Sequence, residues 1–458
     1  MDSLKNIIDG NNISYDVVGK IGEGSQGETF LLRGESHIAK LYKNVVDPTE
    51  LKSKIHFLIN LGLNKRYYAV PLKEITAPRC GYISEFASGM IPLATLKNPG
   101  KEQVFSEWYQ STGGLLKRYG ILIKLAMALR ALHAKGLVYC DLSPNNVFIS
   151  ADPNKHNVFL IDMDNVRYKT SIIHNVYTPF YGAPEVVKNL SPNTSMSDCY
   201  SFAVMAYELL AFNHPLIGDL VADGDPELEE QAVRGELPWV EDSNDDSNSR
   251  STGLPSACFI SKSLQTLFKR TFENGLNDSM ARPSMGEWVD ALNDGLNELL
   301  LCRTCGIHYP YRNIRHCPFC GNGPELPLKI KIQRWEREEY YSAGDNTVKA
   351  RFGLQPMVLD ELYIDENTPK YLKAFHLLSV NDDYDTPIAQ LKIESAGNDE
   401  ARLIIRPLND YVIMFKIPDT DIVKTFDSVK SCRFKLDNHK QMIVGVKNFS
   451  ESQRVLVI

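Results

Sequence analysis

A short polar segment, YCDLSPNN at 139–146, constrains this chain of 458 residues more than any other feature of its sequence. Four residues separate Asp141 from Asn146 in this segment. The apolar run VFLI then leads into Asp162, sixteen positions after Asn146. A carboxylate and an amide oxygen together make a hard oxygen site for Mg²⁺ bound to nucleotide phosphates. A second carboxylate nearby can accept the proton of an attacking hydroxyl. The three residues therefore predict a site for nucleotide and metal.

A glycine cluster, IGEGSQGETF at 21–30, precedes this segment and lies between two strand-like runs. Strands flank it on both sides, which is typical of a flap that covers phosphates. A dinucleotide-binding turn would instead lead from a strand into a helix. Glycine lets the backbone approach phosphate oxygens without a Cβ in the way. Lys40 follows Gly27 by thirteen positions and ends the strand-like run HIAK, where its ammonium can neutralise phosphate charge.

The rest of the chain divides by its apolar pattern. Strand-like alternation covers 13–43, 68–75 and 80–86, and PTELKSKIHFLINL at 48–61 predicts a helix with Pro48 in its first turn. From about 103 to 300 the pattern is mainly helical, with a hairpin formed by the runs at 146–150 and 157–161. The polar, acidic stretch 241–253 predicts a mobile surface loop. Alternating and β-branched runs over 327–458 predict a separate β-rich domain.

Two further motifs complete an ordered set: Ala183-Pro184-Glu185 after TPFYG, and Asp198 at the start of a long apolar run. The order and spacing of these motifs resemble the eukaryotic-type (Hanks-type) serine/threonine protein kinase domain. The resemblance covers roughly 12–300 and implies an α+β, bilobal fold, with an N-lobe at 12–86 and a C-lobe at 87–300. It implies transfer of the γ-phosphoryl group of ATP to Ser/Thr hydroxyls of a protein substrate, including autophosphorylation, with Mg²⁺ or Mn²⁺.

The resemblance also implies roles for individual residues. Lys40 would contact the α/β-phosphates and pair with a helix glutamate, for which Glu50 is the only acidic candidate within 48–61. Ser84 would be the gatekeeper, and Ile21, Ala39 and Phe148 would enclose the adenine ring. The full implied ATP-binding set is Ile21, Gly22, Gly24, Gly27, Ala39, Lys40, Glu50, Ser84, Glu85, Ala87 and Phe148.

In the C-lobe the resemblance makes Asp141 the catalytic base, and Asn146 and Asp162 the Mg²⁺ ligands. The residues implied around the substrate loop are Thr178 near the substrate, Glu185 paired with Arg282, and Asp198 bracing the catalytic loop through its backbone.

Several positions depart from the family pattern. Tyr139-Cys140 replaces His-Arg before the base, which removes the usual partner of a loop phosphate, and Ser143 replaces a lysine. Asp162-Met163-Asp164 replaces Asp-Phe-Gly, so a shifted register with Asp164 as the ligand is an alternative. A nucleotide-binding pseudokinase that acts as a signalling scaffold is the alternative to an active kinase.

Four of the nine cysteines cluster as CRTCG and CPFCG, namely Cys302, Cys305, Cys317 and Cys320. Two C-x₂-C turns aim four thiolates at one point, the tetrahedral set that zinc prefers. The pattern predicts a structural zinc ribbon at 301–323, with His308 or His316 as alternative ligands. A redox role would explain one pair but not the second.

Composition bounds the remaining possibilities. The net charge of −7 gives no argument for nucleic-acid binding. The N-terminus does not read as a secretory signal, and no apolar run could span a bilayer. We therefore expect a cytoplasmic protein without membrane contact.

A narrower resemblance rests on LHAKGLVYCDLSPNNVFI, IDMDNV, NHPLIGD and the cysteine cluster after the last kinase helix. These segments resemble the bacterial kinases found near tellurium-resistance-type and protein-phosphatase-2C-type genes. That resemblance implies bacterial signalling and a phosphatase partner of the 2C type.

Overall fold

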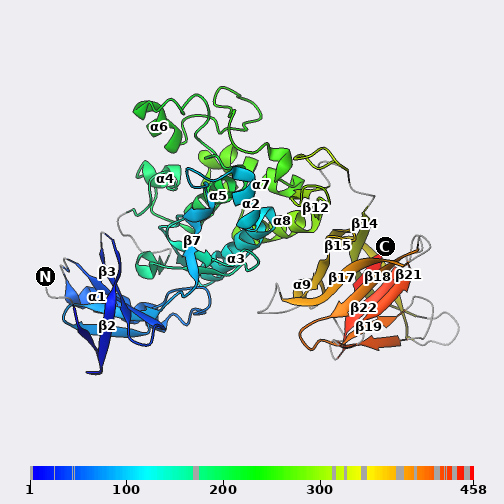
Figure 1. Cartoon of the computed structure of the whole chain (residues 1–458), viewed down its shortest axis with the longest axis horizontal. Helices are drawn as coiled ribbons and strands as arrows, with labels where there is room; N and C mark the ends of the chain where they lie inside the picture. Colours follow the sequence, from blue (N-terminus) through cyan, green and yellow to red (C-terminus); the bar gives the residue numbers. More distant parts are fainter. Residues whose placement is uncertain are drawn as a thin grey trace. The chain divides into compact units, whose positions relative to one another are not determined.

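A computed structural model describes residues 4–457 apart from 25, 44, 46, 169–174, 312–315, 324–326, 342–347, 378–385, 397–399, 417–422, 428, 430, 436–440 and 448–453. The chain forms two compact units (Figure 1). The first unit comprises Met1–Pro255 with Leu264–Asp290, and the second comprises Ser256–Ser263 with Ala291–Ile458.

The N-terminal part of the first unit is a closed six-stranded barrel in the order β1-β2-β3-β4-β6-β5. Its strands are β1 (Asn6–Asp9), β2 (Ser14–Glu23), β3 (Gly27–Leu32), β4 (His37–Tyr42), β5 (Lys73–Ala77) and β6 (Gly81–Glu85). Its interior is apolar, with Ile7, Phe30, Leu32, Ala39, Leu41, Ile75 and Ile83 buried together. Helix α1 (Pro48–Asn60) begins where Asp47 accepts hydrogen bonds from the backbone N–H groups of Thr49 and Glu50.

Two details of this barrel differ from the sequence-based prediction. Strand β1 was not predicted, because four residues are too few to establish a period of two. The predicted strand at 68–75 is wrong at its start: β5 begins at Lys73, and Tyr68 makes only an isolated bridge to Leu160.

The remainder of the first unit is mainly helical. Its helices are α2 (Phe105–Ser111), α3 (Gly114–Ala134), α4 (Pro184–Val187), α5 (Ser195–Ala211), α6 (Pro226–Val233) and α7 (Lys262–Phe272), followed by α8 (Met285–Glu298), whose last turns belong to the second unit. Short strands lie between them: β7 (Met90–Pro92), β8 (Leu137–Val138), β9 (Val147–Ser150), β10 (Val158–Leu160) and β11 (Arg167–Tyr168). Helices α3 and α5 pack on each other and are buried on most sides, as core helices are. None of the described helices is long and apolar enough to cross a membrane.

The polar stretch 241–253 is anchored, contrary to the mobile loop that its composition predicted. Asn248 is fully buried, and its side-chain amide donates to the carbonyls of Leu216 and Pro238. Arg250 contacts Glu241 and the hydroxyl of Tyr207. The composition of the stretch does not reveal this anchoring. The side chains of Asn248 and Arg250 are enough to hold the segment, because they find hydrogen-bond partners in the rest of the domain.

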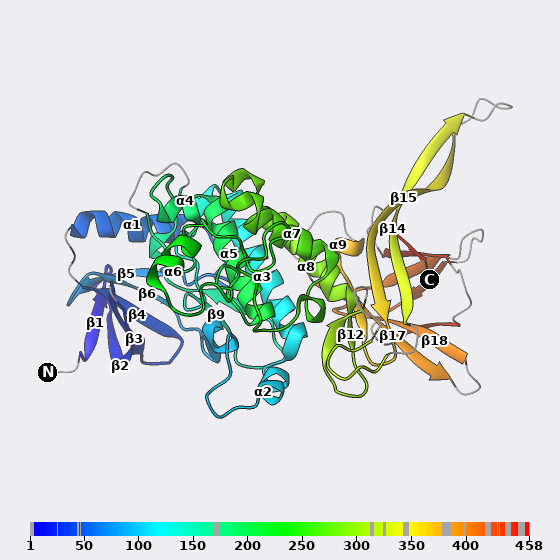
Figure 2. The ribbon, with the colours of Figure 1, turned by 90° about the horizontal axis from the view of Figure 1, so that it is seen from above.

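The second unit contains a small hairpin, β12 (Leu299–Leu301) with β13 (His308–Pro310), and two larger antiparallel sheets. One sheet has the order β15-β14-β23-β22-β19-β20 and the other β16-β17-β18-β21. The strands are β14 (Leu328–Tyr341), β15 (Val348–Ile364), β16 (Lys370–Lys373), β17 (Pro387–Ala396), β18 (Glu400–Pro407), β19 (Ile413–Lys416), β20 (Val423–Phe426), β21 (Cys432–Lys435), β22 (Gln441–Val446) and β23 (Arg454–Val457), with a short helix α9 (Ala374–Leu377). The paired strands β14 and β15 form a long hairpin (Figure 2).

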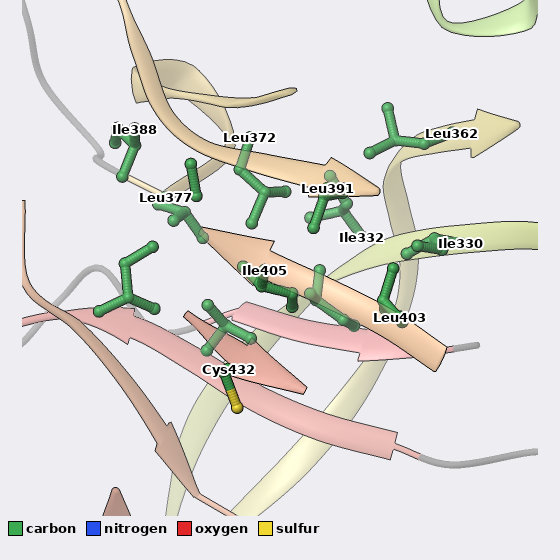
Figure 3. Close-up of a cluster of buried hydrophobic side chains, with 14 of the residues drawn as sticks. Ile330, Ile332, Leu362, Leu372, Leu377, Ile388, Leu391, Leu403, Ile405 and Cys432 are labelled. Carbon is green, nitrogen blue, oxygen red and sulfur yellow. The ribbon is translucent and has the colours of Figure 1, made fainter. Parts of the chain in front are cut away.

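The core of this β domain lies between the two sheets. Buried side chains recur at every second position, as in Ile330 and Ile332 of β14 and Leu403 and Ile405 of β18, so each sheet turns one apolar face inward. Figure 3 shows these side chains directed toward a common interior. The period of two in the sequence thus corresponds to a sandwich of two sheets.

Buried polar contacts join the end of α8 to this sandwich within the second unit. Asp360 accepts from the Asn297 side chain and contacts His376, at 2.7 Å in each case. Lys370 donates to the carbonyls of Leu296 and Leu299, both at 2.8 Å, and so satisfies carbonyls that the end of a helix leaves free.

Lys370 should make the stability of the second unit depend on pH. Burial lowers the pKa of Lys370 to about 7 from the ordinary 10.5, so between these values the unfolded chain holds a proton that the folded chain has released. The free energy of unfolding should therefore rise with pH across this window, by up to about 1.4 kcal/mol per pH unit. Urea unfolding at pH 7.5 and 9.5 measures it. Lys370→Met should show a smaller rise, and an equal rise in the two proteins would contradict the assignment.

Candidate active site

The glycine cluster forms the turn between β2 and β3. Gly24 N–H donates to the carbonyl of Gly27 at 2.9 Å, and a Cβ on Gly24 would meet no other atom within 4 Å. A Cβ on Gly27 would lie 2.6 Å from the carbonyl oxygen of Leu41 on β4. Glycine at position 27 is therefore required by strand packing, whereas a Cβ at position 24 would meet open space.

Lys40 lies on β4 opposite Thr29 of β3 and Tyr82 of β6. Its Nζ is 2.6 Å from Oδ1 of Asp162 and 2.5 Å from Oδ2 of Asp164. Burial lowers the pKa of Lys40, but the two carboxylates outweigh this effect and the net shift is upward. The structure thus brings together two predicted site residues, Lys40 and Asp162, with Asp164 as a third member.

Glu50 does not pair with Lys40, which corrects the expectation from the sequence. Glu50 is exposed in the first turn of α1, where a negative charge suits the helix dipole. The face of α1 toward the barrel is apolar, with Ile55 buried against Tyr42 and Tyr82. The sequence prediction failed because it required the one acidic residue of the helix to point inward, although the periodicity places it outside.

Asp162 follows β10 with a backbone in the left-handed region, at φ 56° and ψ 53°. Cys140, at φ 75°, is also left-handed and directly precedes Asp141. Such strained residues persist where the surrounding structure holds them, and they cluster at functional sites. Burial raises the pKa of Asp162, and the neighbouring Asp164 adds to this shift.

Asp141, Asn146 and Thr178 lie together. The hydroxyl of Thr178 donates to Oδ1 of Asp141 at 2.7 Å, and the amide nitrogen of Asn146 donates to the backbone carbonyl of Asp141 at 2.8 Å and to its Oδ2 at 3.2 Å. Because Asn146 uses its N–H groups in this way, its Oδ1 is the atom suited to a metal ion. The donor set of Asn146 and Asp162 therefore fits Mg²⁺.

Asp198 of α5 fixes the backbone of this loop. Its buried carboxylate accepts from the N–H groups of Tyr139 at 2.7 Å and Cys140 at 2.9 Å, and contacts His133 at 3.0 Å. The contact expected from the resemblance is present, with His133 as an addition.

Asn193 was not singled out from the sequence. This buried side chain donates to the carbonyls of Cys140 and Val176, and accepts from the N–H of Val176 and from the guanidinium of Arg167. It ties the loop that carries Asp141 to the segment that carries Thr178. A single asparagine in a polar stretch gives no signal by itself.

The residues expected around adenine lie on β2, β4, β6 and β9, except Ala87, which follows β6. Ala39 and Ser84 are buried, and within the described residues Oγ of Ser84 has no hydrogen-bond partner. Phe148 and Ala87 are half-buried, while Ile21 and Glu85 are exposed.

Glu185 and Arg282 form a two-pronged ion pair, with distances of 2.8 and 2.7 Å. The guanidinium is fully buried, also donates to the carbonyl of Gly275, and lies over the ring of Tyr200 at 4.9 Å. The pair joins the helix that follows the Thr178 segment to the loop before α8.

Breaking this pair should destabilise the first unit strongly. Arg282→Met leaves the Glu185 carboxylate without its guanidinium, and we expect a loss of about 3–5 kcal/mol in the free energy of unfolding. Denaturant unfolding of the full chain measures the loss. Adding Glu185→Leu should recover part of it, and a double variant no more stable than Arg282→Met would show that the pair is not the cause.

The four clustered cysteines meet in the second unit. The Sγ atoms of Cys302 and Cys320 are 3.5 Å apart, as are those of Cys305 and Cys317, and all four lie within 4.8 Å of one another. Zinc–sulfur bonds of about 2.3 Å in a tetrahedron place sulfurs about 3.8 Å apart, so the set fits zinc.

Glycine conformation shapes both turns of this cluster. Gly306 and Gly321 have φ of 70° and 75°, and their N–H groups donate to the carbonyls of Cys302 and Cys317. In the part of the chain that the structure describes, the group of candidate metal ligands here consists of the four cysteines, without His308 or His316.

Comparison with known proteins relates part of the first unit to a known family. Residues 92–291, which lie mostly in the first unit, match the family model for the protein kinase domain. The matched span begins after the glycine cluster and Lys40, whose place in the site therefore rests on the geometry above.

Two curated relatives illustrate the similarity, and both carry the word kinase in their names. The cAMP-dependent protein kinase type 3 of Saccharomyces cerevisiae is 37% identical over 89 residues, 19% of this chain and 21% of that protein. The human ribosomal protein S6 kinase alpha-2 is 27% identical over 219 residues, 44% of this chain and 28% of that protein. The chain therefore spans less than a third of the length of either relative. A solved kinase domain aligns with a TM-score of 0.45 at 15% identity, over 64% of this chain and 97% of that one.

Proposed function

We propose that this protein is an ATP-dependent kinase that transfers the γ-phosphoryl group to Ser/Thr hydroxyls of proteins, its own chain included. The observation that supports the proposal is the hydrogen bond that the hydroxyl of Thr178 donates to Asp141 at 2.7 Å, because a substrate hydroxyl would make the same contact with a catalytic base. Lys40, Asn146 and Asp162 supply the charges and oxygen ligands that a nucleotide with Mg²⁺ needs.

In the proposed reaction the substrate hydroxyl oxygen forms a bond to the γ-phosphorus while the bond to the bridging oxygen of ADP breaks. Asp141 accepts the hydroxyl proton. Lys40 neutralises phosphate charge, and Asn146 and Asp162 would hold Mg²⁺, which screens the phosphate oxygens. Asp198 keeps Asp141 in place through the two backbone N–H groups.

We also propose that the segment carrying Val176 and Thr178 is held in place without a phosphorylated residue. Burial, together with the neighbouring Asp198, raises the pKa of Cys140 to about 12, so this residue stays a neutral thiol and cannot bind phosphate as an arginine would. Asn193 instead links the catalytic loop to Val176 through neutral hydrogen bonds.

The test is transfer of label from γ-labelled ATP to a generic protein substrate and to the chain itself, with Mg²⁺ or Mn²⁺. Wild type should label, and Lys40→Met should label at least about 100-fold more slowly, because phosphate charge is no longer neutralised. If wild type binds ATP but transfers no label to any acceptor, the pseudokinase scaffold is the better description.

We also propose that Cys302, Cys305, Cys317 and Cys320 bind one structural zinc ion and define a ribbon at 301–323. Four protein ligands fill the tetrahedral sphere, which leaves no open position for catalysis. Metal analysis of the purified chain tests this, with one zinc per chain expected.

A further inference from the structure

Lys40 has two carboxylate partners, and their surroundings differ. The Asp162 side chain is 26% exposed, whereas that of Asp164 is 2% exposed. A metal ion needs a ligand that nucleotide and water can reach, which suits Asp162. Asp164 is closed off from solvent and faces Lys40 from inside the domain.

Asp164 is held in place by its own turn. It is the middle residue of a 3₁₀ turn, Met163–Asn165, in which Met163 is fully buried and the N–H of Val166 donates to the carbonyl of Met163 at 3.0 Å. Tyr42 and Tyr82 are its neighbours: burial first, and then the Asp164 charge, raise the pKa of both hydroxyls. Neither tyrosine carries a positive charge that could neutralise the carboxylate of Asp164.

Charge compensation for Asp164 comes from Lys40. A buried carboxylate is costly unless it is paired. Within the described residues, the cation in ion-pair contact with Asp164 is Lys40, at 2.5 Å. The other oxygen, Oδ1, is buried without a hydrogen-bond partner there.

Helix α1 offers no competing carboxylate. Its buried face consists of Ile55 and Leu58, with Leu51 and Ile59 packed beside Tyr42, and Glu50 is exposed. Protein kinases require an ion pair between the strand lysine and a glutamate of this helix. This chain has the lysine but an apolar helix face.

We infer that Asp164 is the positioning residue of Lys40 and takes the place of the helix glutamate. The inference rests on the proposed function. When Asp162 turns to a nucleotide-bound metal, Asp164 stays with Lys40 and keeps the ammonium directed at the phosphates. Because the carboxylate comes from the segment after β10 rather than from α1, movement of α1 does not make or break the pair.

The first test measures nucleotide affinity with Asp164→Asn, which keeps the shape and removes the charge. ATP should bind about tenfold more weakly, both with Mg²⁺ and with EDTA, because loss of a charge-assisted contact is of that order. In a Lys40→Met background the same change should have no further effect. A loss confined to Mg²⁺ conditions would make Asp164 a metal ligand and overturn the inference.

The second test needs no nucleotide. Lys40 should react faster with an amine-reactive ester in Asp164→Asn than in wild type, as quantified by mass spectrometry, because an ammonium in an ion pair is protected. Asp9→Asn is the matched control: Asp9 is a buried carboxylate of the same barrel that contacts Lys73, at 3.4 Å, instead of Lys40. Equal labelling of Lys40 in wild type and Asp164→Asn, or faster labelling in Glu50→Gln instead, would overturn the inference.

The two tests keep the proposals distinguishable. If wild type neither binds ATP nor transfers phosphate, the proposed function is wrong, and Lys40 labelling still decides whether Asp164 holds the lysine.

Discussion

Asp141→Asn should reduce phosphoryl transfer by about 10²–10⁴-fold while leaving ATP affinity nearly unchanged. The asparagine keeps the size of the side chain but cannot accept the hydroxyl proton, so the loss falls on kcat. Asp141 is not in contact with Lys40, whose carboxylate contacts in the described structure are Asp162 and Asp164. Steady-state transfer and ATP binding on the same preparation measure the two effects.

The control for this prediction is Thr178→Val, which removes the hydroxyl that donates to Asp141 but keeps the carboxylate. It should cost much less than Asp141→Asn, since the base itself remains. Equal transfer by wild type and Asp141→Asn would show that Asp141 is not the base, and equal loss in kcat and in ATP affinity would point to a collapsed site.

The sequence was sufficient where the chemistry is local. Asp141 and Asn146 are five positions apart in one loop, and the cysteines of each knuckle are three positions apart, so spacing alone brings their side chains together. The helix at 48–61 and the hairpin at 146–161 follow equally from local periodicity. These features became α1 (Pro48–Asn60), the β9–β10 pair and the four-sulfur cluster.

Contacts between distant residues could not be predicted in the same way. The partners of Lys40 are 122 and 124 positions away, and the choice between them and Glu50 depends on which face α1 buries. Asn193 and Asn248 act through backbone carbonyls brought to them by the fold. Gly27 has a packing role that its sequence motif does not reveal, because a Cβ there would lie too close to the carbonyl oxygen of Leu41.

Metal removal should have its largest effect on the ribbon. A structural zinc contributes about 10–16 kcal/mol of apparent binding free energy in small zinc domains, and that energy is folding energy. Little else would hold this part of the chain together without the metal, since the buried core around the cysteines consists mainly of Leu300, Tyr309 and Tyr363. Chelation, or Cys317→Ser at the most buried ligand, should therefore expose 301–323 to proteases while ATP binding persists.

Cys432→Ser is the matched control, because it makes the same change at a buried cysteine of the same unit, on β21 and outside the cluster. Cys317→Ser should lose most of its zinc, measured by elemental analysis, and be cleaved within the ribbon, whereas Cys432→Ser should keep one zinc per chain. The reason is geometric: three sulfurs leave one corner of the tetrahedron to water, and a buried serine hydroxyl is a poor substitute for a thiolate. Wild type purified without zinc yet resistant to cleavage at 301–323 would contradict a structural metal.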